Sequence, residues 1–205
     1  MTTPALSETQ IAAEQGLQKL IAGNQRFMQG HAHFPTVCKE TLADLAREQR
    51  PFATILGCSD SRVPPELIFD ANFGELFIVR VAGNVISPEV MGSLQYAGAH
   101  LRTPLFVVLG HAGCGAVKAA LAYKQQGIAE RSRIQILINN ILPGLPEFAT
   151  ELPEPEKLAR AVQANVRWSM HQLLETPEAQ NAINIGAKLV GAVYDIATGQ
   201  VVFLA

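Results

Sequence analysis

The sequence predicts a single α/β domain in which helices flank a mainly parallel central β-sheet, with an N-terminal helical arm and a C-terminal hairpin at the sheet edge. Three observations lead to this prediction. From residue 51 onward, short apolar runs alternate with helical patterns. The runs are almost continuously apolar, which is typical of strands that a parallel sheet buries on both faces. The 205 residues, 48% of them hydrophobic, suffice for one core and leave little room for a second.

Residues 1–50 are expected to form the helical arm, and residues 51–205 the α/β core. Ser7 and Gln10 have the spacing of a capping box at the start of a helix. Apolar side chains then recur on one helical face as far as Met28.

Four apolar runs in the core are the expected parallel strands. Each is short, and two of them end at a glycine. A fifth strand is expected after Thr198-Gly199, where the chain turns back in a hairpin. The four runs are 52–56, 76–79, 105–109 and 189–193.

Helices are expected between these runs. Pro143 ends one clean apolar stripe, and Thr176-Pro177 has the pattern of an N-cap followed by proline in the first helical turn. The segment from Pro143 to Pro155 is expected to be a loop between two helices. The helical segments are 89–100, 116–123, 134–142, 155–174 and a last one from 177.

Composition excludes several classes of function. The 16 basic and 18 acidic residues give a net charge of −2, so the chain has no excess charge for neutralising phosphates and no nucleic-acid partner is expected. Glycine, proline or charge interrupts every long apolar stretch, so no membrane partner is expected. Three cysteines, an odd number, and a first segment unlike a secretory signal favour free thiols in the cytoplasm.

Chemically active side chains follow two of the predicted strands. Gly57-Cys58-Ser59-Asp60-Ser61-Arg62 comes after the first strand, and Gly110-His111-Ala112-Gly113-Cys114-Gly115 comes after the third. In open α/β sheets, ligands bind beyond the carboxyl ends of the strands, where the strand order reverses. We therefore expect both segments to face one crevice.

Cys58, His111 and Cys114 form a candidate zinc site. Thiolate and imidazole are the usual ligands of zinc, and three protein ligands leave a fourth position open for catalysis. The ordinary alternative is that the two cysteines are small buried core residues.

Asp60 and Arg62 have two interpretations. They form either a surface ion pair of little consequence or a catalytic pair, in which Arg62 keeps Asp60 ionised and Asp60 orients a water at the metal. Two thiolates would cancel the charge of a zinc ion, so its water would be less acidic than at a site with three imidazoles. Activity is therefore expected to rise on the alkaline side of neutral pH.

The two motifs resemble those of the β-class carbonic anhydrases. C-S-D-S-R-V-P at residues 58–64 and G-H-A-G-C-G at residues 110–115 carry the resemblance. It extends over about residues 16–203, through segments that match the family pattern in order. These segments are 23–27, 74–77, 80–84, 93–96 and 190–195.

The resemblance implies reversible hydration of carbon dioxide to bicarbonate by zinc-bound hydroxide. It implies one zinc per chain on Cys58, His111 and Cys114, with Asp60 and Arg62 as catalytic residues. It further implies dimers, often paired into tetramers, whose helical arm packs on the partner subunit and whose pockets include residues from across the interface. The substrate-binding residues that it implies are Gln49, Phe77, Tyr96 and Gly115.

Two other functions remain open at this point. A carbonyl sulfide or carbon disulfide hydrolase would use the same ligands and the same Asp-Arg pair. A non-catalytic zinc- or bicarbonate-binding regulator would be expected to lose Asp60, Arg62 or a metal ligand. The chain retains all five residues.

Overall fold

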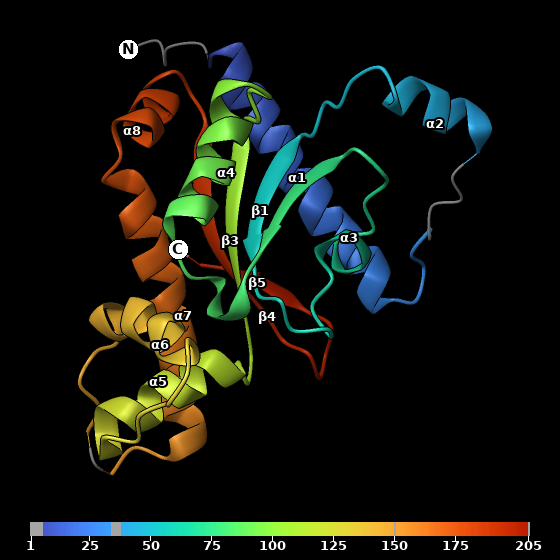
Figure 1. The fold of residues 1–205 in the computed structure, drawn as a ribbon. Helices are drawn as coiled ribbons and strands as arrows, with labels where there is room; N and C mark the ends of the chain where they lie inside the picture. The colour runs from blue at the N-terminus through green and yellow to red at the C-terminus, as the bar shows by residue number, and fades with distance from the viewer. Residues whose placement is uncertain (1–5, 34–37, 150, 205) are drawn as a thin grey trace, which may run out of the picture.

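The structure is a computed structural model that describes residues 6–33, 38–149 and 151–204. Its centre is one five-stranded sheet with the strand order β2-β1-β3-β4-β5 (Figure 1). The strands are β1 (Ala53–Gly57), β2 (Leu76–Arg80), β3 (Leu105–His111), β4 (Lys188–Tyr194) and β5 (Val201–Phe203).

The strand pairing confirms the mainly parallel sheet and the terminal hairpin. β1 pairs in parallel with β2 on one side and with β3 on the other, and β3 pairs in parallel with β4. β5 returns antiparallel to β4, after a turn in which the Gly199 N–H donates to the Asp195 carbonyl at 2.8 Å. Because β2 and β3 lie on opposite sides of β1, the strand order reverses between β1 and β3. In this kind of fold, that reversal opens a crevice at the carboxyl ends of the strands.

The helices follow the predicted segments, except that the four-residue helix Pro65–Ile68 was not predicted. Ser7 forms the predicted capping box with Gln10, and the Thr176 hydroxyl accepts from the Ala179 N–H at 3.3 Å as the predicted N-cap. The α-helices are α1 (Glu8–Met28), α2 (Lys39–Leu45), α3 (Pro65–Ile68), α4 (Pro88–Ala99), α5 (Gly115–Gln126), α6 (Ile134–Ile141), α7 (Glu154–Leu174) and α8 (Pro177–Asn184).

Helices cover both faces of the sheet because side chains alternate along the buried strands. Ile55 and Val107 pack in a core with residues of α1 and α3, whereas Leu56 and Val108 pack with residues of α4 and α7 on the opposite face. A third apolar cluster lies among α5, α6 and α7, at the lower end of the sheet in Figure 1. Cys58, which directly follows β1, belongs to this third cluster. The cluster therefore lies at the carboxyl end of β1.

One face of α1 packs on its own chain. Leu20 of α1 is fully buried and packs in the core on the sheet of the same chain. Gly23 of α1 approaches the backbone at Phe69 so closely that a Cβ there would lie 1.8 Å from its carbonyl oxygen. α2 is different, because none of its residues is buried and it stands away from the body of the chain in Figure 1. The packing of residues 1–50 on a partner subunit stays a prediction.

The expectation that all parallel strands are buried on both faces fails for β2. β1 is buried at all five positions, but β2 is only half-buried from Leu76 to Val79 and exposed at Arg80. The reason is its place in the sheet, since β2 is an edge strand with one paired neighbour. An apolar run alone does not distinguish an edge strand from a central one.

A buried carboxylate ties α1 to the segment after α3. The Asp70 side chain is 1% exposed and accepts hydrogen bonds from Arg26 Nε at 2.5 Å and from the His33 backbone N–H at 2.7 Å. Burial alone would raise the pKa of Asp70, but these bonds lower it below the usual value of a carboxyl. Because the folded-state pKa is below that of the unfolded chain, ionised Asp70 stabilises the fold above about pH 4, and this contribution is lost as the pH falls further.

Asp70→Asn is therefore expected to lower the free energy of unfolding by about 2 kcal/mol at pH 7, the usual loss for hydrogen bonds to a charged group. The difference from the original chain should shrink by pH 3. Urea denaturation at the two pH values measures both effects. The matched control is Asp44→Asn, because Asp44 and its partner Arg47 are 80% exposed and 3.9 Å apart. An Asp70→Asn variant as stable as this control at pH 7 would contradict the assignment.

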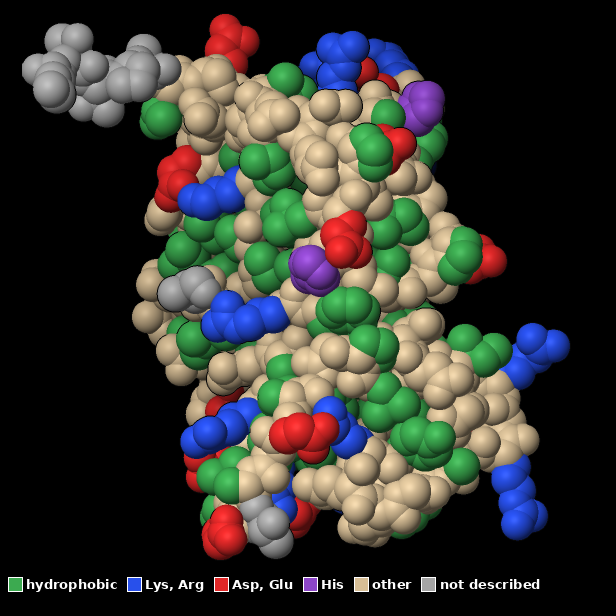
Figure 2. All heavy atoms as spheres, turned by 90° about the vertical axis from the view of Figure 1, so that its left-hand side faces the viewer, with side chains coloured by type: hydrophobic (Ala, Val, Ile, Leu, Met, Phe, Trp, Pro, Cys, Tyr) green, Lys and Arg blue, Asp and Glu red, His purple; other side chains and the backbone are tan. Residues whose placement is uncertain are grey.

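Charged side chains of both signs are interspersed on the surface that carries α6, α7 and α8, which faces the viewer in Figure 2. This mixture agrees with the near-zero net charge. Among the helices in the described part of the chain, none is both long and apolar enough to cross a membrane.

Candidate metal centre

The ends of β1 and β3 bring three metal-ligating side chains together, as the two motifs predicted. The Sγ atoms of Cys58 and Cys114 and a ring nitrogen of His111 all lie within 4.8 Å of one another. The three side chains are buried, with exposed fractions of 4%, 1% and 0%. Two sulfurs and one imidazole nitrogen are the ligands that zinc prefers, so the chemistry of this donor set fits that metal.

The local backbone explains how one loop supplies two ligands. His111 is the last residue of β3, and Gly113 then takes a left-handed conformation with a φ of 69°. This conformation, which glycine adopts without strain, turns the chain into α5. Cys114 is the N-cap residue of α5, so its side chain returns to the same side as His111.

The hydrogen bonding of His111 prepares its other ring nitrogen as a ligand. Nδ1 lies 3.0 Å from the carbonyl oxygen of Ala112, so it carries the proton and donates. Nε2 is buried and has no hydrogen-bond partner in the structure. A neutral imidazole with a free, buried lone pair is the form that binds a metal ion.

The two thiols are coupled. The hydrogen bond with Cys114 lowers the pKa of Cys58 far below that of a free thiol, and the Gly83 N–H, 3.3 Å from the Cys58 sulfur, lowers it further. Its hydrogen bond to ionised Cys58, together with burial, raises the pKa of Cys114. Cys58 therefore loses its proton easily, whereas Cys114 keeps its proton, because two buried anionic sulfurs repel each other. A divalent cation removes this repulsion, which is a second reason to place a metal here.

Asp60 and Arg62 form the predicted pair. Arg62 Nε donates to Asp60 Oδ1 at 2.9 Å, and Arg62 Nη2 donates to Oδ2 at 2.7 Å. These hydrogen bonds hold the pKa of Asp60 far below its usual range, so the carboxylate is ionised throughout the neutral range. Asp60 Oδ2 also lies 3.9 Å from His111 Nε2, so the carboxylate faces the position to which the imidazole lone pair points.

Arg80 fixes the loop that carries Cys58 and Asp60. It is the last residue of β2, and the end of β2 lies beside the end of β1. Its Nε donates to the Cys58 carbonyl at 2.9 Å, and its Nη2 donates to the Asp60 carbonyl at 2.6 Å. This role was missed in the sequence, where the signal is an arginine at the carboxyl end of a strand parallel to β1.

The family of the chain follows from comparison with known proteins. Residues 53–201 match the carbonic anhydrase family. A carbonic anhydrase of Mycolicibacterium smegmatis is 37% identical over an alignment of 183 residues, and the alignment covers 87% of each chain. The chain belongs to the β-carbonic anhydrase family.

Other β-carbonic anhydrases share the fold. A tetrameric β-carbonic anhydrase of Sordaria macrospora superposes with a TM-score of 0.74 at 26% identity, covering 93% of this chain and 98% of the other. The β-carbonic anhydrase of Coccomyxa, solved in complex with acetazolamide, gives 0.69 at 26% identity and covers 98% of this chain and 87% of the other. The single α/β fold predicted from the sequence is thus that of β-carbonic anhydrases.

The substrate residues implied by the resemblance to β-carbonic anhydrases lie in two places. Gly115 follows Cys114 directly, and a Cβ there would meet nothing within 4 Å, so it borders open space beside the cluster. Phe77 and Tyr96 lie together instead, with ring centroids 6.2 Å apart, and Phe77 is three residues before the end of β2. Gln49 is exposed and precedes β1, whereas Cys58 follows it, so all five residues of β1 lie between the two in the sequence. Of the four, Gly115 directly adjoins a metal ligand in the sequence, and the substrate roles of all four stay predictions.

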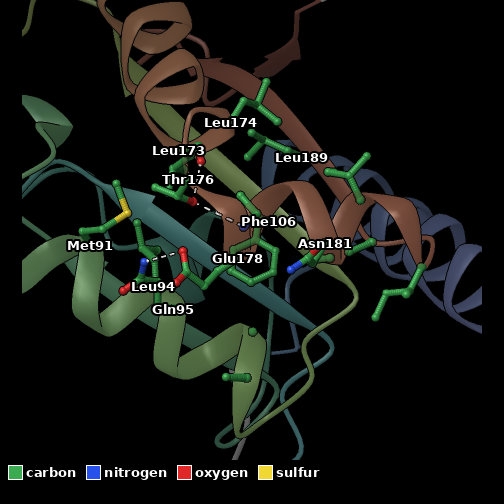
Figure 3. A pocket seen from close by; sticks show the side chains of 17 residues that line it. Met91, Leu94, Gln95, Phe106, Leu173, Leu174, Thr176, Glu178, Asn181 and Leu189 are labelled. Atoms are coloured by element: carbon green, nitrogen blue, oxygen red, sulfur yellow. Dashed lines mark hydrogen bonds between the residues drawn. The ribbon is translucent and has the colours of Figure 1, made fainter.

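A cavity of about 350 Å³ lies apart from the metal ligands of this β-carbonic anhydrase, between α4, α8 and the sheet (Figure 3). Its lining is mostly apolar and includes none of the three ligands. The Gln95 side chain of α4 donates to Glu178 of α8 at 3.1 Å across it. The candidate site is therefore the cluster at the strand ends and not this cavity.

Proposed function

We propose that this member of the β-carbonic anhydrase family catalyses the reversible hydration of carbon dioxide to bicarbonate and a proton, with one zinc ion per chain. The observation that carries the proposal is the joint geometry of five side chains. Two buried cysteines and a histidine with a free Nε2 converge, and an ionised carboxylate held by an arginine faces the same point. The match to the carbonic anhydrase family and the similarity to the Mycolicibacterium smegmatis carbonic anhydrase support it.

The five residues of the site have different roles. Cys58, His111 and Cys114 would hold the zinc, and the bound ion supplies the Lewis acidity that makes water a nucleophile near neutral pH. Asp60 accepts a hydrogen bond from the reacting water at Oδ2 and so orients it toward carbon dioxide. Arg62 fixes the direction of this carboxylate and lowers its pKa still farther below neutral. Since Asp60 stays ionised, the released proton passes to solvent buffer and is not stored on this carboxylate.

Turnover of three small substrates by zinc-loaded protein tests the function. We expect the value of kcat/KM for carbon dioxide to exceed those for carbonyl sulfide and carbon disulfide. A zinc-loaded protein that turns over carbonyl sulfide or carbon disulfide but not carbon dioxide would contradict the proposal and identify a hydrolase. A zinc-loaded protein that turns over none of the three would indicate a regulator that binds zinc or bicarbonate.

We also propose that the chain forms dimers, alone or paired into tetramers, and that Gln49, Phe77 and Tyr96 complete the pocket of the partner subunit. Gln49 is at the opposite end of β1 from its own Cys58, and Phe77 and Tyr96 form an aromatic pair beside the edge strand β2. The tetrameric assembly of the Sordaria macrospora relative supports an oligomer.

Co-expression of two variants, each expected to have an impaired site, tests this arrangement. A Gln49→Ala chain keeps Asp60, and an Asp60→Asn chain keeps Gln49. If Gln49 acts across the interface, half of the randomly formed dimers are hybrids with one intact site, and about a quarter of the original sites are restored. If Gln49 acts in its own subunit, the mixture is no more active than the separate variants.

We propose the cytoplasm as the location of the protein. The site requires Cys58 and Cys114 as free thiolates, and a reducing compartment keeps them so.

A further inference from the structure

A tight turn after β2 lies against the metal ligands. It is a 3₁₀ turn, Ala82–Asn84, and the Gly83 N–H donates to Cys58 Sγ at 3.3 Å. Gly83 and Asn84 both have left-handed backbone conformations, with φ values of 73° and 44°. Such a conformation is uncommon for a residue other than glycine, so surrounding contacts must hold the turn in place.

Two polar side chains of α7 hold this turn by its carbonyl oxygens. Asn165 Nδ2 donates to the Gly83 carbonyl at 2.8 Å, and Ser169 Oγ donates to the Asn84 carbonyl at 3.0 Å. The two side chains are four residues apart, so they lie one above the other on one face of the helix. Each bonds one of the two left-handed residues.

Asn165 and Ser169 are polar side chains at buried positions of α7. Asn165 is 1% exposed and Ser169 is fully buried, among positions of α7 that are otherwise mainly apolar. Burying an amide or a hydroxyl is unfavourable unless it is hydrogen-bonded. Asn165 Oδ1 and Asn84 Nδ2 lack partners in the structure, so this arrangement leaves two buried polar atoms unsatisfied. An aliphatic residue at position 165 would remove one of these unsatisfied atoms, but an aliphatic residue at 165 or at 169 would release a carbonyl of the turn.

We propose that Asn165 and Ser169 are positioning residues of the metal centre. They hold the Gly83–Asn84 turn so that the Gly83 N–H points at the Cys58 sulfur. Outer hydrogen bonds of this kind orient a metal ligand and tune its electron donation to the metal. The inference rests on the proposed zinc site, and it assigns part of the zinc affinity to two residues more than 100 positions away from Cys58 in the sequence.

Zinc affinity measured against a competing chelator tests the proposal. Asn165→Ala and Ser169→Ala are each expected to weaken zinc binding by about 10-fold, the lower end of what the loss of an outer hydrogen bond costs a metal site. Val166→Ala is the matched control. Val166 is fully buried on the same helix and packs against Gly110 and Gly191 of the sheet, but its side chain has no polar atom that could bond a carbonyl of the turn. Its zinc affinity is expected to stay within about 2-fold of the original, although it also loses packing.

The cobalt-substituted proteins give a second readout, independent of activity. Removal of an N–H···S hydrogen bond makes the thiolate a stronger donor, so the sulfur-to-cobalt charge-transfer band should move to longer wavelength in both variants and not in Val166→Ala. Ser169→Thr, which keeps the hydroxyl, should restore the original band. If Asn165→Ala does not fold, Ser169→Ala, which removes a single oxygen, decides the matter. Affinities and bands equal to those of Val166→Ala would overturn the proposal, whereas an original chain that binds no zinc would overturn the proposed function itself.

Discussion

Replacing Cys114 with serine is expected to remove zinc from the protein and to abolish carbon dioxide hydration. The serine hydroxyl is a harder donor that stays protonated near neutral pH, so it cannot replace a thiolate that binds zinc. The loss of activity should exceed roughly 100-fold. That is the largest loss typical of replacing a residue that contacts a metal ligand but not the metal itself. Elemental analysis and stopped-flow hydration measure the two effects on the same sample.

Cys38→Ser is the matched control for this substitution. Cys38 is exposed, lies at the start of α2, and is not among the residues of the metal cluster. It should therefore keep one zinc per chain and the original rate. A Cys114→Ser protein that kept both its zinc and a rate within about 10-fold of the original would contradict the assignment of Cys114 as a ligand.

Asp60→Asn is expected to lower the rate by about 100- to 1,000-fold while leaving the zinc content unchanged, as is typical of a group that positions or accepts a proton in the reaction. The amide has almost the same shape but no charge. It keeps one acceptor for Arg62, and its NH₂ group would donate where the carboxylate accepts. The rate should fall at every pH from about 6.5 to 9, because Asp60 is ionised over that whole range.

Arg62→Ala separates the charge of Asp60 from its orientation. Without Arg62 the pKa of Asp60 returns toward the ordinary range, which is still well below 7. The carboxylate stays ionised at neutral pH and loses only its fixed direction, so the rate should fall less than in Asp60→Asn. An Asp60→Asn variant with an undiminished rate, or one that lost its zinc, would contradict the role given to this carboxylate.

The sequence predicted the strands and the metal ligands for the same reason. A parallel sheet buries continuous apolar runs, and the polar residues directly after such runs must lie at its carboxyl edge. Cys58, His111 and Cys114 could therefore be placed together without knowledge of the side-chain packing. The helix caps at Ser7 and Thr176 were predictable because they depend on residues within one turn.

Features that depend on distant packing could not be predicted in this way. The apolar stripe of α1 shows that one face is buried but not which chain buries it, and the structure assigns Leu20 to its own sheet. Asparagine and serine are usually exposed, so the sequence gives no sign that Asn165 and Ser169 are buried. Only the fold reveals that they are buried and bonded to a turn more than 80 residues earlier.

A zinc titration of the hydration rate tests the central claim most directly. Metal-free protein would be loaded with increasing zinc, and the initial rate of carbon dioxide hydration measured by stopped flow at each step, at a fixed alkaline pH. The account predicts a rate that rises in proportion to bound zinc and reaches its limit at one zinc per chain. Full zinc occupancy without carbon dioxide hydration, or hydration that does not depend on zinc, would contradict it.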